Sequence, residues 1–220
     1  MKRAMDVRVN IKPIFSNVVH TAVWEGPCRV GTPEELSPAY ESRVGKEQAK
    51  LWAKSLWENL SPYANVMEAA YIEYTENFYV PDESYEQLKA DLPEVDLFLI
   101  SYRLPGLERL GKPISMINNG PAPVDLGAFY ADTGKTFYFA HDYEEFNGII
   151  ELLQVKKAMA NTKLLVLTAS EQFPVSVNSS NPNLFGLNQR YGIRSARRSI
   201  KDVFEVMKKL DCEERISQTA

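Results

Sequence analysis

The sequence predicts an α/β fold in which a doubly wound parallel sheet is covered by helices on both faces. Strand-like runs alternate with longer amphipathic segments, in the order β-α-β-α-β-β-α-β-α-(β)-α, which is typical of parallel sheets. Two of these runs, Val95–Ile100 and Lys163–Leu167, are mainly apolar, as strands buried on both faces are. Because no repeat, low-complexity tract or linker interrupts the order, we expect one domain over residues 1–220.

The first part of the chain is expected to begin with one strand and one long helix. Val7–Ile14 alternates apolar and polar residues with the period of a strand, and Pro13 is expected to mark its end. A long irregular loop at residues 15–40 follows the strand, and within it Thr32-Pro33-Glu34-Glu35 has the pattern of a capping box. Apolar residues at four-residue steps then predict a helix from about Glu41 to Leu60.

The rest of the chain continues the alternation. Asp82 and Asp142 each precede an amphipathic segment at the position of a helix N-cap. The expected elements are, in order, a strand at Asn65–Tyr74, a helix from Asp82 to Pro93, strands at Val95–Ile100 and Pro113–Ile117, a helix from Asp142 to Asn161, a buried strand at Lys163–Leu167, a helix from Asn181 to Gly192 and a last helix capped by Ser199. Together they predict a Rossmann-like or flavodoxin-like sheet.

Composition and charge narrow the classes of partner. The chain has 220 residues, 45% of them hydrophobic and 25% charged, with a net charge of −4. An acidic balance argues against a nucleic-acid partner, and no apolar run approaches the ~20 residues that span a membrane. The N-terminus lacks the apolar region of a secretory signal, and Cys28 and Cys212 are too few for a disulfide framework. We therefore expect a cytoplasmic protein.

Each expected strand runs into a short polar loop, and none runs into a glycine-rich phosphate cradle. The loops begin at Phe15-Ser16-Asn17, Ser101-Tyr102-Arg103, Asn118-Asn119-Gly120 and Thr168-Ala169-Ser170-Glu171. If the strands are parallel, these loops lie along the edge of the sheet where open α/β folds bind ligands. Amides, hydroxyls and a guanidinium suit a neutral polyhydroxylated ligand better than a nucleotide, so we expect a monosaccharide or polyol.

Eight residues on these loops are the candidate ligand-binding residues. The segment that follows the first strand carries an imidazole, an indole, a carboxylate and a guanidinium, which could stack on a sugar and bind its hydroxyls. Polar residues after two later strands would line the same crevice. The candidates are His20, Trp24, Glu25, Arg29, Tyr102, Arg103, Asn118 and Asn119. The alternative interpretation is an ordered surface loop around Trp24, with Asn-Gly and Pro-Gly serving only to turn the chain.

Other reactive residue types have simpler structural explanations. Cys28 has no histidine at a diagnostic spacing and is expected to be structural. Asp142 is explained as a helix cap, which makes the preceding His141 a loop residue. The basic run from Arg190 to Lys201 is expected to be a solvated face or a subunit contact. No dinucleotide, Walker, GxSxG, HExxH or paired CxxC motif is present, and we expect no metal site in this chain.

Several segments resemble the N-terminal region of the L-fucose/L-arabinose isomerase-like proteins. They include His141–Phe146, Leu152–Ala158, Asn161–Leu167 and Leu187–Ile193. That family has a "D-a-hydrophobic" strand, a "K-P-hydrophobic" segment, a helix, an "L-K-N-x-K-hydrophobic" strand and an "F-G-I" turn. The counterparts here are Val95-Asp96-Leu97, Lys112-Pro113-Ile114 and Ala160-Asn161-Thr162-Lys163-Leu164. The resemblance covers most of the chain and rests on pattern more than on a rare motif.

The resemblance implies an aldose–ketose isomerase that uses a Mn²⁺-type metal held by carboxylates and a histidine. Those ligands belong to domains that follow the region matched here, so the chain alone is not expected to be a competent isomerase and no cofactor is expected in it. The N-terminal domain of such enzymes contributes subunit contacts and residues at the rim of a neighbour's pocket. This implies a homo-oligomer, with His20, Trp24 and Arg29 as the residues that the first loop would lend.

Three hypotheses of function follow. The first is the N-terminal domain of a sugar isomerase-like protein, which contributes to the substrate pocket and to subunit contacts. The second is a stand-alone cytoplasmic sugar-binding or assembly module without catalysis. The third is a flavodoxin-like enzyme that uses the Asn118-Asn119-Gly120 loop for a phosphate-bearing ligand.

Overall fold

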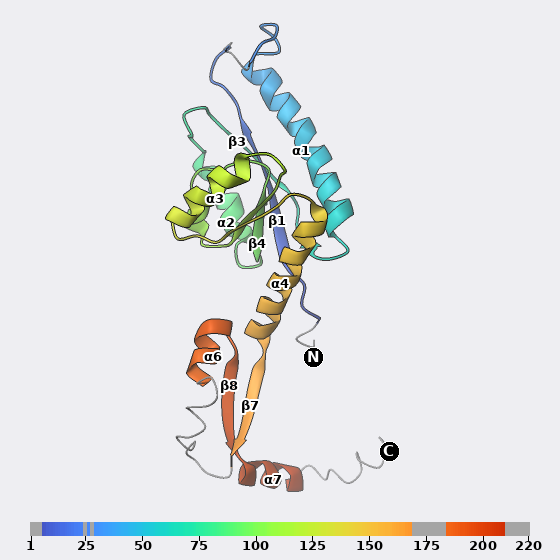
Figure 1. The fold of residues 1–220 in the computed structure, drawn as a ribbon, viewed down its shortest axis with the longest axis vertical. Coiled ribbons are helices and arrows are strands. Elements are labelled where there is room, and N and C mark those ends of the chain that lie inside the picture. The colour runs from blue at the N-terminus through green and yellow to red at the C-terminus, as the bar shows by residue number, and fades with distance from the viewer. Residues whose placement is uncertain (1–5, 24–25, 27–28, 169–183, 210–220) are drawn as a thin grey trace. The chain divides into compact units, whose positions relative to one another are not determined.

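Six parallel strands form the main sheet of the computed structural model (Figure 1). The sheet follows the order β2-β1-β4-β5-β6, and β3 also pairs with β1. The strands are β1 Asn10–Val18, β2 Asn65–Val66, β3 Ala70–Tyr74, β4 Leu97–Ile100, β5 Ile114–Ile117 and β6 Phe137–Ala140. The structure describes residues 6–23, 26, 29–168 and 184–209. The predicted α/β fold with a doubly wound parallel sheet is confirmed.

Helices cover both faces of this sheet. They are α1 Pro38–Leu60, α2 Asp82–Asp91, the 3₁₀ helix η2 Leu107–Leu110, α3 Ala122–Asp132 and α4 Tyr143–Asn161. A hydrophobic core lies on each face of the sheet, and alternate residues of β4 pack into the two cores. Leu97 and Leu99 pack with α1 and α4, whereas Phe98 and Ile100 pack with α2, η2 and α3. This alternation explains why the sequence of β4 is apolar throughout.

We expected one domain over residues 1–220, and the contacts divide the chain into two compact units. One unit is Arg8–Leu153, which contains the main sheet, and the other consists of Met1–Val7 and Gln154–Ala220. The second unit contains β7 Lys163–Thr168, α6 Leu184–Tyr191, β8 Arg194–Ser199 and α7 Ile200–Lys209. Its two strands pair with each other in parallel and form a separate sheet.

The prediction that Lys163–Leu167 is a buried strand of the main sheet is wrong. β7 pairs only with β8 among the described strands, and Leu165 is 57% exposed. The apolar run correctly indicates a strand, but the sheet to which a strand belongs is decided by distant partners. The basic run also contains β8, at the place of the bracketed strand in the predicted order, although Ala196 is the only apolar residue in it.

Pro13 does not end β1, as the sequence suggested, but lies inside it. The strand pairs with β2 at Asn10 and Ile11 and with β3 from Ile14 to Val18. Pro13 falls between these two ladders, where its missing N–H group interrupts no pairing with β2 or β3. The strand therefore reaches Val18, and the irregular loop expected at residues 15–40 begins four residues later and ends at α1.

The predicted caps at Thr32 and Asp142 are formed, although the residues after Thr32 make a turn and not a helix. The predicted cap at Asp82 is wrong, because Asp82 is the first residue of α2 and Pro81 precedes it without a side-chain cap. Thr32 N–H donates to Glu35 Oε2 over 2.8 Å, and Glu35 N–H donates back to Thr32 Oγ1 over 3.3 Å, which is the reciprocal pattern of a capping box. Asp142 Oδ1 accepts from Glu145 N–H over 2.9 Å at the start of α4. Of the helices that the structure describes, none combines the length and the apolar character needed to cross a membrane.

Candidate functional site

The carboxyl ends of the strands in the main sheet are where a ligand site is expected. If β2 and β3 are counted as one strand, the five strands, renumbered along the chain, lie in the order 2-1-3-4-5. The strand order changes direction between β1 and β4, which makes this the topological switch point. At this switch point Ser16 N–H donates to Ser101 Oγ over 3.1 Å, and Ser16 Oγ donates to the Tyr102 carbonyl over 2.8 Å. The ends of β1 and β4 are thus joined by side-chain hydrogen bonds.

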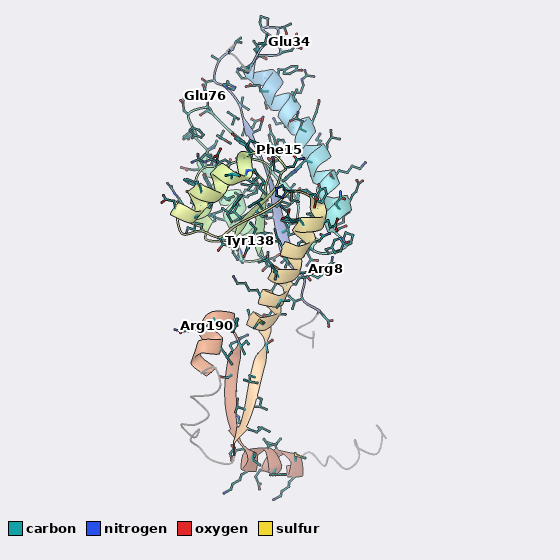
Figure 2. The ribbon with its side chains drawn as sticks, viewed as in Figure 1. Arg8, Phe15, Glu34, Glu76, Tyr138 and Arg190 are labelled. Atoms are coloured by element: carbon teal, nitrogen blue, oxygen red, sulfur yellow. The ribbon has the colours of Figure 1, made fainter. Side chains whose placement is uncertain are left out.

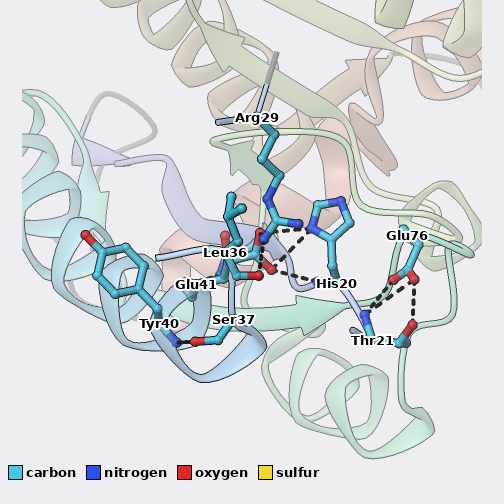
Figure 3. A network of polar contacts seen from close by, with 9 residues as sticks. His20, Thr21, Arg29, Leu36, Ser37, Tyr40, Glu41 and Glu76 are labelled. Carbon is cyan, nitrogen blue, oxygen red and sulfur yellow. Dashed lines mark hydrogen bonds and ion pairs between the residues drawn. The ribbon is translucent and has the colours of Figure 1, made fainter. Parts of the chain in front are cut away.

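Two of the predicted residues, His20 and Arg29, converge on Glu41 (Figure 3). The Glu41 carboxylate accepts from His20 N–H over 2.8 Å, lies 2.9 Å from His20 Nδ1 and forms an ion pair with the Arg29 guanidinium. The three side chains are only 15–24% exposed. We call His20, Arg29 and Glu41 the loop cluster. The sequence did not suggest Glu41 as a site residue, because Glu41 begins the predicted helix and so lies just outside the loop expected at residues 15–40.

Further hydrogen bonds hold the loop after β1 in place. Arg29 also donates to the Leu36 carbonyl over 2.8 Å, and Thr21 donates to Glu76 through its backbone N–H and through its hydroxyl, the latter over 2.7 Å (Figure 3). The hydrogen bonds from Thr21 lower the pKa of Glu76. Glu41 lies in the first turn of α1, where a carboxylate interacts favourably with the helix dipole. The loop cluster therefore anchors the loop to α1.

A second network of polar side chains, Asn17, Tyr71 and Glu73, lies between α1 and the sheet. Asn17 Nδ2 donates to Tyr71 Oη over 3.2 Å and to the Glu41 carbonyl over 3.2 Å, and Tyr71 Oη donates to Glu73 Oε1 over 2.6 Å. Burial, followed by the hydrogen bond to Glu73, raises the pKa of Tyr71. Gly45 allows this contact, because a Cβ atom there would lie 2.3 Å from Asn17 Nδ2.

A cavity of about 330 Å³ opens at the carboxyl ends of β4, β5 and β6, on the face covered by α1 and α4. We call it the edge cavity. Its size is at the lower end of the range for small-molecule sites. Its lining residues are Trp52, Leu56, Leu99, Ile117, His141, Asp142 and Tyr143. Apolar residues of the strands and of α1 thus meet an imidazole, a carboxylate and two aromatic rings.

The side chains around the edge cavity are held by neighbours. The Trp52 ring meets Phe15 edge-on at 5.8 Å, and Phe15 stacks on Tyr71 at 6.1 Å. Phe15 is labelled in Figure 2. The Tyr143 and Ser55 hydroxyls are 2.9 Å apart, which ties α4 to α1. An aromatic wall with fixed polar groups beside it is the usual composition of a site for a small polar ligand.

The two polar residues that precede α4 are oriented by Glu145. His141 N–H donates to Glu145 Oε2 over 2.7 Å, and His141 Nδ1 lies 2.9 Å from the same oxygen. Asp142 uses Oδ1 to cap the helix, as predicted. The sequence explained His141 and Asp142 as a loop residue and a cap, and Trp52 is one of the apolar residues at four-residue steps that predicted α1. The structure contradicts none of these assignments, but the sequence did not indicate that the three residues line one cavity.

We expect the pKa of Glu145 to lie below its usual range. The hydrogen bond from the His141 backbone is the main cause, and the contact with the His141 side chain adds to it. Because folding lowers this pKa, the carboxylate stabilises the fold above the pKa of the unfolded chain, and this contribution is lost as the pH falls through the folded value. An NMR titration of the Glu145 carboxyl carbon measures this pKa. His141→Ala should raise the pKa partway toward the usual value of a glutamate, because it removes the side-chain contact and keeps the backbone hydrogen bond. A pKa that does not change in this variant would contradict the side-chain contribution.

The other predicted site residues have individual environments. The Arg103 guanidinium lies over the Phe129 ring at 4.6 Å and the Phe78 ring at 5.6 Å. Tyr102 is 51% exposed. Asn118 Oδ1 accepts from Gly120 N–H over 2.6 Å, so this loop's Gly120 N–H is already engaged. Asn119 is exposed, and Trp24, Glu25, Cys28, Cys212 and residues 169–171 and 181–182 lie outside the described residues. A ligand-binding role for the predicted residues stays a prediction.

The Mn²⁺ that the resemblance implies finds no set of ligands in the part of the chain that the structure describes. No three His, Cys, Asp or Glu side chains gather there in a way that could hold a metal ion. The described residues therefore do not fit this metal, and we derive no catalytic step through it.

A larger hollow, of about 490 Å³, lies between α2 and η2. Acidic and basic side chains of both helices line it together with Tyr85, and Lys89 forms an exposed ion pair with Glu86 over 2.6 Å. Its lining residues do not come from the carboxyl ends of the strands. Position and composition therefore favour the edge cavity as the candidate ligand site.

Comparisons with known proteins do not assign the chain to a family. No family model matches it, and no curated protein gives a significant match.

Proposed function

We propose that the unit Arg8–Leu153 binds a monosaccharide or polyol in the edge cavity, as the N-terminal domain of an aldose–ketose isomerase-like protein. The edge cavity is the observation that carries the binding part of this proposal. It lies at the edge of the sheet where α/β folds bind ligands, and its volume of about 330 Å³ suits a small molecule. The isomerase part is supported by the resemblance of the sequence.

The chemistry of the lining favours a sugar over an anion. The indole of Trp52 offers an apolar surface for the C–H groups of a sugar ring, and His141 and Asp142 offer a donor and acceptors for its hydroxyls. A carboxylate at the start of α4 would repel a phosphate that the helix N-terminus could otherwise attract. A neutral polyhydroxylated molecule can contact the indole with its C–H groups and can form hydrogen bonds with His141 and Asp142 through its hydroxyls.

Thermal unfolding in the presence of L-arabinose, L-fucose and the matching polyols tests the proposal. We expect at least one of these compounds to raise the melting temperature in the absence of added metal, because a ligand that binds only the folded state stabilises it. If none of them changes the melting temperature at concentrations where weak binding would be visible, the proposal is wrong.

Replacing Trp52 with leucine should weaken the binding of the best of these compounds by about tenfold, which corresponds to ~1.4 kcal/mol. The reason is the loss of the aromatic wall of the edge cavity. Trp57→Leu is the matched control, because Trp57 is on the same helix but is 58% exposed and does not line the cavity. Isothermal calorimetry measures both variants. Equal affinities for the two would contradict the assignment of the cavity.

Asp142→Asn is a second variant that keeps the helix cap, since asparagine caps as well as aspartate does. It should weaken sugar binding while it leaves the melting temperature of the free protein close to that of the wild type. A large loss of stability would instead mean that the charge of Asp142 serves the fold.

The alternative function is a stand-alone cytoplasmic sugar-binding or assembly module without catalysis. Both functions predict binding in the edge cavity, and they differ in what the binding is for. Incubation of the 220-residue chain with L-arabinose or L-fucose and Mn²⁺, followed by a ketose assay, separates a competent isomerase from both proposals. We expect no ketose from this chain alone; turnover would mean that it carries its own catalytic groups.

A further inference from the structure

The strands β7 and β8 form a small sheet whose leucines are exposed. Six residue pairs join the strands in parallel, from Lys163 with Arg194 to Thr168 with Ser199. Leu165 and Leu167 point to one face and are 57% and 46% exposed, whereas Leu164 points to the other and is 39% exposed. Parallel sheets are normally covered on both faces, and two strands alone are marginally stable in water.

The two outer edges of this sheet differ in character. β8 reads Arg-Ser-Ala-Arg-Arg-Ser, and Arg194 and Arg198 are exposed. Charges of one sign along an edge strand oppose pairing with another strand. β7 reads Lys-Leu-Leu-Val-Leu-Thr, with its only charge at the first position. In the described part of the chain β7 has no strand partner other than β8. The edge suited to further pairing is therefore that of β7.

The sequence of β7 is suited to pairing with itself. An antiparallel pair related by a two-fold axis at Val166 places Leu165 of each copy opposite Leu167 of the other, and Leu164 opposite Thr168. The Leu165–Leu167 pairs lie on one face of the joint sheet, where such cross-strand apolar pairs stabilise it. Lys163 falls beyond the end of the paired segment, so no like charges meet.

We propose that β7 is a dimerisation strand, at which a second copy of this chain adds its own β7 in antiparallel orientation. The occupant is a second copy because one strand supplies both halves of a matched apolar pairing. The result is a four-stranded sheet in the order β8-β7-β7-β8, with the arginine-rich strands at both outer edges, where they prevent further addition. This inference is independent of the sugar-binding proposal.

Light scattering coupled to size exclusion tests the dimer with the 220-residue chain. We expect the wild type to have the mass of a dimer, and Leu165→Lys to have the mass of a monomer, since a charge would enter the paired strands. Leu152→Lys is the matched control, because Leu152 is an exposed leucine on α4, outside β7. A monomeric wild type overturns the proposal, and so does a Leu165→Lys variant that remains dimeric.

Disulfide trapping tests the register in which the two β7 strands pair, and it does not rely on a destabilised variant. In a chain with Cys28→Ser and Cys212→Ser, Val166→Cys lies on the two-fold axis opposite itself and should form a disulfide-linked dimer on mild oxidation. Ser195→Cys, on β8, should not do so. If the two cysteine variants give the same yield of linked dimer, the β7 pairing is wrong.

Discussion

Replacing Glu41 with alanine is expected to lower the free energy of unfolding by about 2–3 kcal/mol. The change leaves the Arg29 guanidinium, 15% exposed, and the His20 backbone N–H without their shared carboxylate acceptor. The cost comes mainly from largely buried donors that lose this acceptor, although Arg29 keeps its hydrogen bond to the Leu36 carbonyl, and it exceeds the cost of removing an exposed ion pair. Chemical denaturation of the wild type and the variant measures the difference.

Glu47→Ala is the matched control for this prediction. Glu47 is an exposed residue of the same helix, so its loss should change the stability by no more than ~0.5 kcal/mol. Glu41→Gln should fall between the two, because the amide oxygen can still accept hydrogen bonds but the negative charge is gone. If Glu41→Ala is as stable as Glu47→Ala, the loop cluster is a surface contact and does not anchor the loop.

Replacing Gly45 with alanine is expected to destabilise the protein by about 1–3 kcal/mol. In a helix interior this substitution is normally favourable, by up to ~1 kcal/mol. Here the new Cβ would lie 2.3 Å from Asn17 Nδ2 and 2.8 Å from Tyr71 Oη, and both groups are held by hydrogen bonds. The steric conflict therefore outweighs the gain in helix propensity.

Gly148→Ala provides a control with the opposite sign. Gly148 lies in the interior of α4, and apart from its two chain neighbours and the local helix backbone no atom lies within 4 Å of the place where its Cβ would be. We expect this variant to be as stable as the wild type or more stable, by up to ~1 kcal/mol. Thermal and denaturant unfolding of both variants decide the matter. If both glycine variants are stabilised, the polar group under α1 rearranges at little cost.

Local signals in the sequence predicted much of the fold. The Asp142 cap and the capping box at Thr32 depend on residues within one turn of each other, and both form as expected. α3 was missed because Pro121, just before it, and Pro123, near its start, suggest a turn, although prolines are tolerated in the first turn of a helix. β6 was missed because Phe-Tyr-Phe-Ala has neither the alternation of β1 nor the mainly aliphatic run of the equally short β4.

The features that the sequence did not reveal depend on distant partners. Whether Lys163–Leu167 is covered is decided by elements far from it in the chain, and its apolar composition is the same in either case. The edge cavity is assembled from α1, the ends of three strands and the start of α4, so no single segment carries its pattern. Glu41 completes the loop cluster from 12 positions beyond Arg29, a separation at which no local spacing rule applies.

The continuity of α1 has a mechanical consequence. The helix runs without interruption from Pro38 to Leu60 and carries Glu41 near its start and Trp52 eleven residues later, about 16 Å along its axis. A continuous helix is stiff, so a tilt that adjusted the indole to a ligand in the edge cavity would also displace the carboxylate that holds the loop after β1. Binding in the edge cavity would thus shift the loop after β1.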